Sequence, residues 1–425
     1  MINKIKNRLT SLEGIKYFKN FSFLFLEKSI RLIISFLIIS QISRYIGPDK
    51  YGILSIVESI FSILIAISAL GLDPMIIKHL QLKKYSEQEI LGTAFLFKLL
   101  ASFITVLSFI IIIYNFIDDS NLRLGAYILF PAIFFSSLNV IDYYYQYKVE
   151  SKLTASLRTL SFISSALLKG VVIFYSLEWT YLFYAILFDQ FLTAFLYFLN
   201  KPKSFKLSFS KKLSLELFNS SFYLTISSIS IIFLSRVDQV MIKSMLTNFD
   251  LGNYAAAQKI VEISYIFPAL LINSILPKIV EKLNSSESQE SIFLSKLFKI
   301  IALTSILITA IIFILKKKII LLVFGNDFSL SSELLGVYSF SVFFFSIKIA
   351  FQQVLYAKGL EKNLMFQSIF TLMINIIFNY ILIKLYGVIG AVYATLISII
   401  FSAFIYDFFD KDLRKYIKYK FLLVK

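Results

Sequence analysis

The chain has 425 residues, of which 58% are hydrophobic and only 16% are charged, and its formal net charge is +17. Soluble domains carry about 25% charged residues, so this composition excludes a soluble globular protein and predicts an integral membrane protein. The sequence has no cysteine and one histidine, which excludes disulfides and thiol catalysis and argues against a histidine-based metal site. The basic excess is attributed to cytoplasmic loops and not to nucleic-acid binding.

Apolar runs long enough to cross a bilayer recur along the sequence, and they predict an all-α membrane protein with twelve spanning helices. The basic amino-terminal segment lacks a small-residue cleavage site, so we expect it to remain as an uncleaved cytoplasmic end. The predicted spans are 20–46, 51–77, 90–117, 122–147, 153–176, 179–200, 217–246, 252–278, 292–315, 332–357, 362–385 and 387–409.

The distribution of basic residues between the predicted spans indicates the orientation of the chain. With the amino terminus placed inside, 28 of the 43 Lys and Arg residues fall in inner segments and 8 in outer loops. Lys and Arg are enriched in cytoplasmic loops. We therefore expect a multi-pass protein of the bacterial cytoplasmic (inner) membrane with both termini in the cytoplasm.

The segment "SRYIGPDKYGILS" (43–55) joins the first two spans. Gly47 can adopt backbone angles closed to other residues, Pro48 cannot continue the preceding helix, and Asp49 can cap the next one. The segment therefore predicts a tight turn between two antiparallel helices. Gly47, Pro48 and Gly52 are candidates for an outer gate hinge, and a simple turn without a gating role is the alternative.

An internal repeat relates the two halves of the chain. "YAILFDQFLTAFLYF" begins at Tyr184, and "YATLISIIFSAFIYD" begins 209 residues later at Tyr393. The same shift relates Tyr147 to Tyr356. An even number of spans in each copy makes the two repeats parallel. We therefore predict two pseudo-symmetric six-helix bundles around a central cavity, formed by residues 1–205 and 206–425.

Three motifs carry a resemblance to a known family. They are "RYIGPDKYGILS" with "GLD" (Gly71–Asp73), "RVDQVMIKSM" with "LGNYAAAQKI" (Leu251–Ile260), and "GVIGAVYATLIS" (Gly387–Ser398). Together they resemble polysaccharide (O-antigen or capsule) flippases of the Wzx type, from the superfamily that also holds multidrug and toxin extruders and lipid II flippases. The resemblance implies a transporter without cofactors, whose cargo is an oligosaccharide linked to undecaprenyl diphosphate. It also implies possible partners among polysaccharide polymerases and chain-length proteins.

Basic residues within the spans are the candidates for binding an anionic cargo. An ionisable side chain near a helix centre costs about 2.5–3.5 kcal/mol on insertion scales, so such residues tend to face a polar cavity. Arg presents a planar fork to phosphate oxygens, and Lys presents a compact charge. The seven candidates for a cationic substrate cavity are Arg31, Lys169, Arg236, Lys348, Lys28, Lys98 and Lys259.

Some of these residues allow a different interpretation. Arg31 with Glu27, and Lys259 with Glu262, have the spacing of neutralised pairs on one helical face. Lys28 and Lys98 lie near span ends, where their side chains can snorkel toward water.

Carboxylates within the spans are candidates for coupling transport to a gradient of H⁺ or Na⁺. They are Asp238, Glu262, Asp142 and Glu58. Asp238 ranks first because it lies deep in its span, two residues after Arg236, so that the two side chains point to different faces.

The alternative with the same fold is a cation-coupled multidrug or toxin extruder. Its cavity would be acidic or apolar to accept cationic drugs, whereas the spans here contain surplus basic residues. A membrane enzyme, such as a polysaccharide polymerase or an acyltransferase, is disfavoured because such enzymes usually need a large outer loop or an intramembrane histidine, and the predicted outer loops are short. We find no phosphate-binding glycine loop, metal cluster or nucleotide motif, so no ATP use is expected. His79 lies beside Lys78 at a predicted inner edge, and an interfacial histidine explains it better than catalysis.

Overall fold

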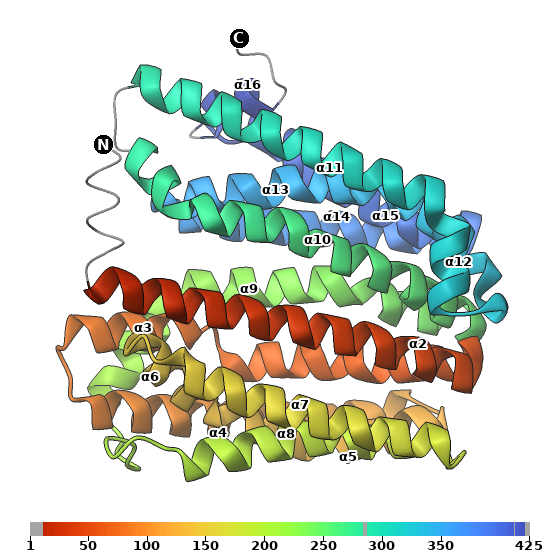
Figure 1. Cartoon of the computed structure of the whole chain (residues 1–425), viewed down its shortest axis with the longest axis horizontal. Coiled ribbons are helices and arrows are strands. Elements are labelled where there is room, and N and C mark those ends of the chain that lie inside the picture. Colours follow the sequence, from red (N-terminus) through yellow and green to blue (C-terminus); the bar gives the residue numbers. More distant parts are fainter. Residues whose placement is uncertain (1–11, 284–286, 412, 421–425) are drawn as a thin grey trace. The chain divides into compact units, whose positions relative to one another are not determined.

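The computed structural model describes residues 12–283, 287–411 and 413–420, and within these ranges the chain is mainly helical and has no strand. Figure 1 shows the helices in sequence colours. In chain order they are α2 (Leu12–Ala69), α3 (Asp73–Leu82), α4 (Glu87–Phe116), α5 (Ser120–Phe135), α6 (Val140–Tyr147), α7 (Ser151–Phe174), α8 (Tyr181–Leu199), α9 (Lys211–Met245), α10 (Asn248–Leu283), α11 (Glu287–Val323), α12 (Ser329–Tyr338), α13 (Phe340–Ala357), α14 (Glu361–Tyr386), α15 (Val388–Ile400) and α16 (Ile417–Lys420).

The predicted membrane-spanning helices are confirmed. Among the described residues, eleven helical segments are long and apolar enough to cross a membrane. The first of them, Glu27–Leu82, has 56 residues and covers residues 27–46 of the first predicted span and all of the second. The fold is therefore that of an all-α integral membrane protein with twelve spans.

The chain reverses direction within α2, as the sequence predicts. Gly47 has φ 71° and ψ 175°, which are not helical angles. Pro48 follows it directly, at the start of the second arm of α2. Figure 1 shows the chain turning back at the end of the first arm of α2. A positive φ is accessible to glycine without steric cost, and proline fits the first turn of a helix because it needs no N–H donor there.

Helix starts elsewhere are fixed by side-chain caps. At the start of α4, Ser86 and Glu89 form a reciprocal capping box, in which the Ser86 hydroxyl accepts from the Glu89 N–H at 3.2 Å and the Ser86 N–H donates to the Glu89 carboxylate at 3.0 Å. Thr247 and Asp250 make the same arrangement before α10, with a Thr247 hydroxyl to Asp250 carboxylate distance of 2.6 Å. These bonds satisfy N–H groups that the helix leaves unpaired.

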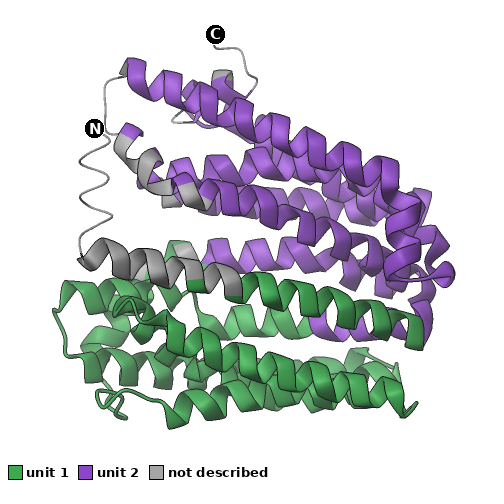
Figure 2. Ribbon diagram, in the orientation of Figure 1, with its two compact units in different colours: residues 1–45, 60–225 green, residues 46–59, 226–425 purple. Residues whose placement is uncertain are grey.

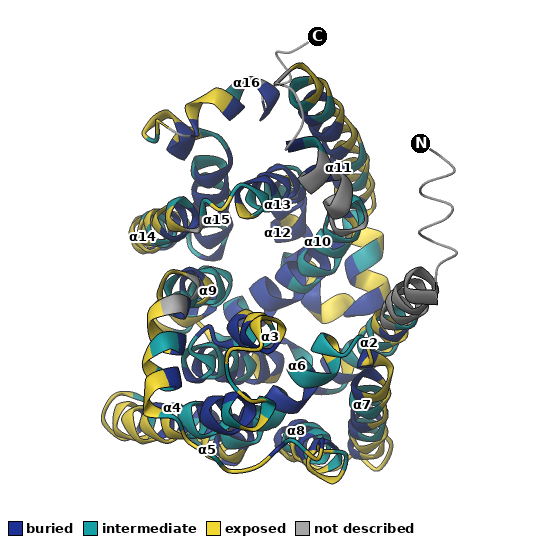
Figure 3. Ribbon diagram, turned by 90° about the vertical axis from the view of Figure 1, so that its left-hand side faces the viewer, coloured by how far each residue is buried: buried dark blue, intermediate teal, exposed yellow. Residues whose placement is uncertain are grey.

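Large apolar side chains on the outer helices point away from their neighbours. On α4, Phe103 and Leu107 are more than half exposed. In Figure 3 the exposed residues of α4 lie on the side turned away from the other helices. Such an extended apolar surface is typical of a protein surrounded by lipid.

The described residues form two compact units, which are coloured separately in Figure 2. Unit 1 comprises Met1–Tyr45 and Ile60–Thr225, and unit 2 comprises Ile46–Ser59 and Ile226–Lys425. The helices α2 and α9 each contribute residues to both units. The predicted boundary between residues 205 and 206, which divides the chain by repeat and not by contacts, stays a prediction.

The internal repeat is also visible in the backbone. Left-handed residues occur after α6 at Val149 (φ 56°) and after α13 at Gly359 (φ 71°), about 210 residues apart. A second pair follows at Ser176 (φ 51°) between α7 and α8, and at Gly387 (φ 65°) between α14 and α15. Equivalent helix ends in the two halves therefore both contain a residue with positive φ, which supports the predicted duplication.

The carboxy-terminal segment completes the core of unit 2. Leu413, Tyr416 and Tyr419 are buried in a cluster with Phe351 of α13 and residues of α10 and α11. Lys420 is fully buried, forms an ion pair with the equally buried Asp407, and donates to the Ala403 carbonyl at 2.9 Å. Its ammonium group lies 3.3 Å from the centre of the Phe351 ring.

We predict that the buried pair between Lys420 and Asp407 is strongly coupled. Removing one partner leaves the other charge buried without compensation, which costs about 3–5 kcal/mol, whereas replacing both by apolar residues is much less harmful. Lys420→Met should shorten the half-life of the detergent-solubilised protein at a fixed elevated temperature more than tenfold. The double variant Lys420→Met with Asp407→Leu should recover most of that loss, and simple additivity of the single effects would contradict the coupling.

Candidate functional site

An arginine held by a buried carboxylate lies on the first arm of α2 in unit 1. Arg31 Nη1 lies 3.2 Å from Glu27 Oε1, one helical turn away, so the predicted local pair is present. The Glu27 side chain is 3% exposed, whereas that of Arg31 is 35% exposed. The carboxylate thus fixes one arm of the guanidinium and leaves the rest accessible.

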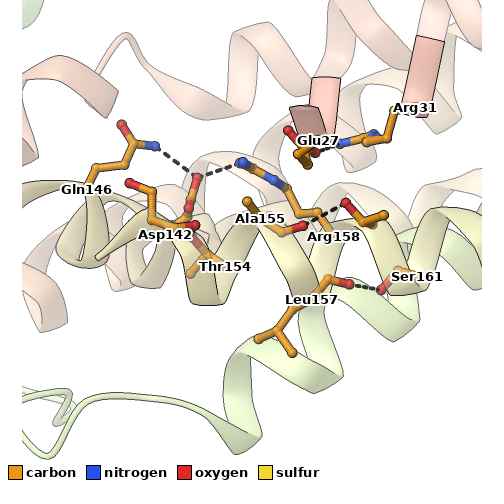
Figure 4. A network of polar contacts seen from close by, with 11 residues as sticks. Glu27, Arg31, Asp142, Gln146, Thr154, Ala155, Leu157, Arg158 and Ser161 are labelled. Atoms are coloured by element: carbon orange, nitrogen blue, oxygen red, sulfur yellow. Dashed lines mark hydrogen bonds and ion pairs between the residues drawn. The ribbon is translucent and has the colours of Figure 1, made fainter. Parts of the chain in front are cut away.

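A second pair of the same kind joins α6 and α7, and Figure 4 shows both pairs together. Arg158 Nη1 lies 2.7 Å from Asp142 Oδ2, which also accepts from Gln146 Nε2 at 2.9 Å. The Asp142 side chain is 6% exposed and that of Arg158 is 27% exposed. The sequence analysis counted Arg158 as a cytoplasmic loop residue and missed it. Arg158 lies within the fifth predicted span, and this position could have identified it as a basic residue of the membrane region.

Arg158 and Lys169 lie on one face of α7, and Arg31 of α2 contacts the same face at Phe162. The Arg31 guanidinium lies 5.0 Å from the centre of the Phe162 ring. Phe162 follows Arg158 by four residues, or about 6 Å along the helix axis, and Lys169 follows Phe162 by two turns on the same face. Asp189 of α8 lies within electrostatic range of Lys169 and Arg31. We call Arg31, Arg158 and Lys169 the unit 1 basic stripe.

Several polar atoms beside this stripe have no hydrogen-bond partner. They are Asp142 Oδ1, Arg158 Nε and the Tyr197 hydroxyl, and all three are buried. Tyr197 of α8 is electrostatically coupled to Asp142, Arg158 and Arg31, so these groups are close neighbours.

The other two predicted basic residues of unit 1 differ in their surroundings. Lys98 is buried and forms an ion pair with Asp73 of α3, and its ammonium group lies 5.1 Å from the Tyr143 ring centre. Lys98 is therefore neutralised by an acid that is distant in sequence. Lys28 is exposed on α2.

In unit 2, Arg236 of α9 pairs with Glu262 of α10, and their Nη1–Oε1 distance is 2.9 Å. The sequence offered Lys259 as a possible partner of Glu262 and gave Arg236 no partner on its own helix, whereas the structure pairs Arg236 with Glu262. The arginine reaches across from a neighbouring helix, whereas Lys259 is half-buried on the same helix as Glu262. Glu58 lies near this pair, since Glu58 and Glu262 both act electrostatically on Tyr51.

Asp238 lies at the centre of a buried polar cluster in unit 2. Its carboxylate accepts from the Tyr254 hydroxyl at 2.7 Å, from Thr395 at 2.6 Å and from Asn379 Nδ2 at 2.6 Å. Asn379 Oδ1 and Asn375 lie beside it, and Asn379 Oδ1 has no hydrogen-bond partner. Within the described residues no Lys or Arg pairs with Asp238. The hydroxyl and amide donors therefore supply the hydrogen bonds that a buried carboxylate requires.

Lys348 lies inside unit 2. It is 5% exposed on α13, in a buried stretch that includes Ile347, Ala350 and Phe351. Its predicted role as a cavity residue that contacts cargo stays a prediction.

The turn between the two arms of α2 packs closely on α10 within unit 2. A Cβ atom added to Gly52 would lie 2.4 Å from the Asn248 carbonyl oxygen, and one added to Gly252 would lie 1.9 Å from the Pro48 carbonyl oxygen. Tyr51 is buried against Phe324 and Phe328, with ring-centre distances of 5.8 and 5.7 Å. The turn and the start of α10 are thus in close backbone contact.

Residues 17–283 match the family described as "Polysaccharide biosynthesis protein". Residues 224–381 also match the family described as MatE. Over 190 residues the chain is 28% identical to the probable low-salt glycan biosynthesis flippase Agl15 of Haloferax volcanii. That alignment covers 43% of this chain and 39% of the length of Agl15.

Solved transporters have the same fold. The lipid II flippase MurJ in an inward closed conformation gives a TM-score of 0.73 at 14% identity, covering 94% of this chain and 90% of MurJ. An inward-facing multidrug resistance MATE family transporter of the MOP superfamily gives 0.68 at 14% identity, with 92% and 99% covered. A MOP superfamily transporter from Pyrococcus furiosus, described by the reverse polarity of its binding pocket, gives 0.65 at 12% identity, with 95% and 96% covered.

Two glycine-to-alanine variants should have opposite effects on stability. Gly252→Ala places a methyl group against the Pro48 carbonyl, and such overpacking typically costs about 1–3 kcal/mol. Gly170 lies within α7 with no atom near the added methyl group, so Gly170→Ala should stabilise the protein by about 0.5–1 kcal/mol. The half-life of the purified protein at a fixed denaturing temperature measures both effects. Equal effects of the two variants would show that the turn is not closely packed.

Proposed function

We propose, from the premise that the chain belongs to the family of polysaccharide biosynthesis proteins, that it is a flippase for a lipid-linked oligosaccharide. The observation that carries this proposal is the unit 1 basic stripe, in which two partly exposed arginines form ion pairs with buried carboxylates. The resemblance to a glycan flippase over part of the chain and to the fold of MurJ supports it. The specific cargo proposed is a surface-polysaccharide repeat unit, such as O-antigen, on undecaprenyl diphosphate.

The chemistry of the stripe suits a diphosphate. Arg31 and Arg158 each use one arm for a carboxylate and keep donors that can bind phosphate oxygens. Lys169 adds a third positive charge on the same face of α7. Arg236 offers the same kind of paired guanidinium in unit 2.

The sugar head and the lipid tail of the proposed cargo place different demands on the transporter. The sugar head cannot cross hydrocarbon unaided, because each unpaired polar group costs several kcal/mol there. The isoprenoid tail is apolar and can remain in the lipid. In the proposed mechanism two six-helix halves, residues 1–205 and 206–425, open the binding site alternately to each side of a bacterial cytoplasmic membrane. The turn at Gly47, Pro48 and Gly52 forms the outer gate.

Asp238 is the proposed coupling site for Na⁺ or H⁺. Glu262 and Asp142 are already paired with arginines, whereas Asp238 accepts hydrogen bonds from neutral groups only. The carboxylate, the unpaired Asn379 Oδ1 and the Thr395 hydroxyl are hard oxygen atoms of the kind that bind Na⁺. A proton on Asp238 would balance the charge equally well.

A cation-coupled multidrug extruder is the second candidate. The MatE match over residues 224–381 favours it, and the basic stripe argues against it. A drug-resistance phenotype on expression, without any effect on surface polysaccharide, would favour the extruder.

Export by arginine variants tests the substrate site. In a strain that lacks its own flippase, Arg31→Ala and Arg158→Ala should each lower surface polysaccharide at least tenfold, since each removes a charge-assisted contact worth about 1.5–3 kcal/mol. Arg123→Ala is the matched control, because Arg123 pairs with the fully exposed Asp118 away from the stripe. Membrane levels of all variants must be equal. Wild-type export by both stripe variants would exclude the assigned site.

Ion dependence tests the coupling site separately. Asp238→Asn keeps the shape of the side chain but removes its negative charge, so Na⁺ or low pH should no longer raise the thermal stability of the purified protein. Transport in proteoliposomes should lose its response to the imposed ion gradient. If the variant keeps the wild-type response to both ions, Asp238 is not the coupling residue. The response of the wild type to Na⁺ or to pH identifies the ion.

A further inference from the structure

The connection between α8 and α9 is a fixed segment of unit 1. It has no helical structure between Asn200 and Ser210, yet Phe205 is buried and its ring contacts Phe95 at a centre distance of 5.5 Å. The Ser208 hydroxyl donates to the Gln88 carbonyl at 2.8 Å, and the Ser210 N–H donates to the Thr93 hydroxyl at 3.0 Å. These contacts hold the segment against the start of α4.

A glycine allows this close approach. A Cβ atom added to Gly92 of α4 would lie 2.5 Å from the carbonyl oxygens of both Lys206 and Ser208. The backbone of the connection therefore lies directly on the helix. Phe205, Ser208 and Ser210 contact α4, and other side chains of the connection are exposed.

The exposed side chains of the connection are lysines and large apolar residues that lie close together in the sequence. Leu207 is 71% exposed and Phe209 is 58% exposed. Five lysines surround them, and all five are exposed: Lys201, Lys203, Lys206, Lys211 and Lys212. We call residues 201–212 the basic strap. A loop that faced only water would not present a phenylalanine and a leucine from a rigid backbone.

Two carboxylates near the strap, Glu216 and Glu87, already form ion pairs with lysines outside it. Glu216 accepts from Lys84 and from Tyr85, each at 2.8 Å, and these hydrogen bonds hold the pKa of Glu216 below its usual value. Glu87 pairs with Lys148 at 2.7 Å. Within the described residues, no strap lysine forms an ion pair. The positive charge of the strap is therefore available to an external anion.

The strap starts at the membrane surface. It follows α8, a spanning helix of 19 residues, whose length of about 28 Å is close to the thickness of the hydrocarbon core. Lysines combined with exposed apolar side chains are typical of protein segments that lie in the head-group region of anionic membranes.

We propose that the basic strap is a binding site for anionic phospholipid head groups. Leu207 and Phe209 insert into the interface, and the lysines bind the phosphates around them. Transport does not enter this inference, so it stands apart from the proposed cargo.

A single fluorescent label tests the proposal. The chain has no native cysteine, so Phe209→Cys gives one labelling site for an environment-sensitive dye. In nanodiscs of equal parts phosphatidylcholine and phosphatidylglycerol, the emission should shift to shorter wavelength and aqueous quenching should fall, compared with phosphatidylcholine alone. Each lysine contributes about a fivefold gain in affinity for anionic lipid. The triple variant Lys203→Gln, Lys206→Gln, Lys212→Gln should therefore lose about a hundredfold in affinity for anionic lipid and should show little of the shift in the same nanodiscs.

A matched triple variant controls for net charge. Lys50→Gln, Lys317→Gln, Lys318→Gln also removes three exposed lysines, none of which lies on the strap, and it should leave the label response unchanged. Identical emission and quenching in the two membranes would overturn the proposal. An equal loss in both triple variants would also overturn it, because the effect would then follow net charge and not the strap.

Discussion

The arrangement of ionisable side chains in this protein depends on one constraint, which is the cost of leaving a charge unpaired in hydrocarbon. Within the spans, Glu27 holds Arg31, Asp142 holds Arg158 and Glu262 holds Arg236. In the two pairs of unit 1 the carboxylate is buried and the guanidinium is partly exposed. The acid therefore determines the position of the arginine, and the arginine offers its remaining donors outward. On the proposed function, pairing thus serves both stability and binding.

The same constraint explains why so much of the fold could be predicted. A membrane allows only structures that satisfy their own backbone, so an apolar run of sufficient length predicts a helix with little ambiguity. The turn at Gly47 and Pro48 was equally predictable, because those two residues have narrow and known backbone preferences. The depth and direction of Asp238 followed from helical periodicity alone.

The pairing partners could not be predicted, because they depend on which helices are neighbours. Local spacing favoured Lys259 for Glu262, yet Arg236 of the adjacent helix takes that position. Asp73 and Lys98 are 25 residues apart in the chain but form an ion pair. The repeat was also less visible in sequence than in structure. Val149 adopts a left-handed conformation where the second half has Gly359, and a β-branched residue at positive φ gives no such signal in the sequence.

Paired arginines also suit a carrier that must release what it binds. An isolated buried guanidinium would bind a diphosphate strongly, because the anion would be its only compensation. When a carboxylate already supplies part of that compensation, the anion gains only the remaining donors, and the empty site stays neutral enough to exist within the membrane. Binding and release then differ by a modest free energy, which an ion bound at Asp238 or the membrane potential can supply. At about 2.3 kcal/mol per charge and 100 mV, the potential is of the right size to favour outward movement of an anionic head over its return.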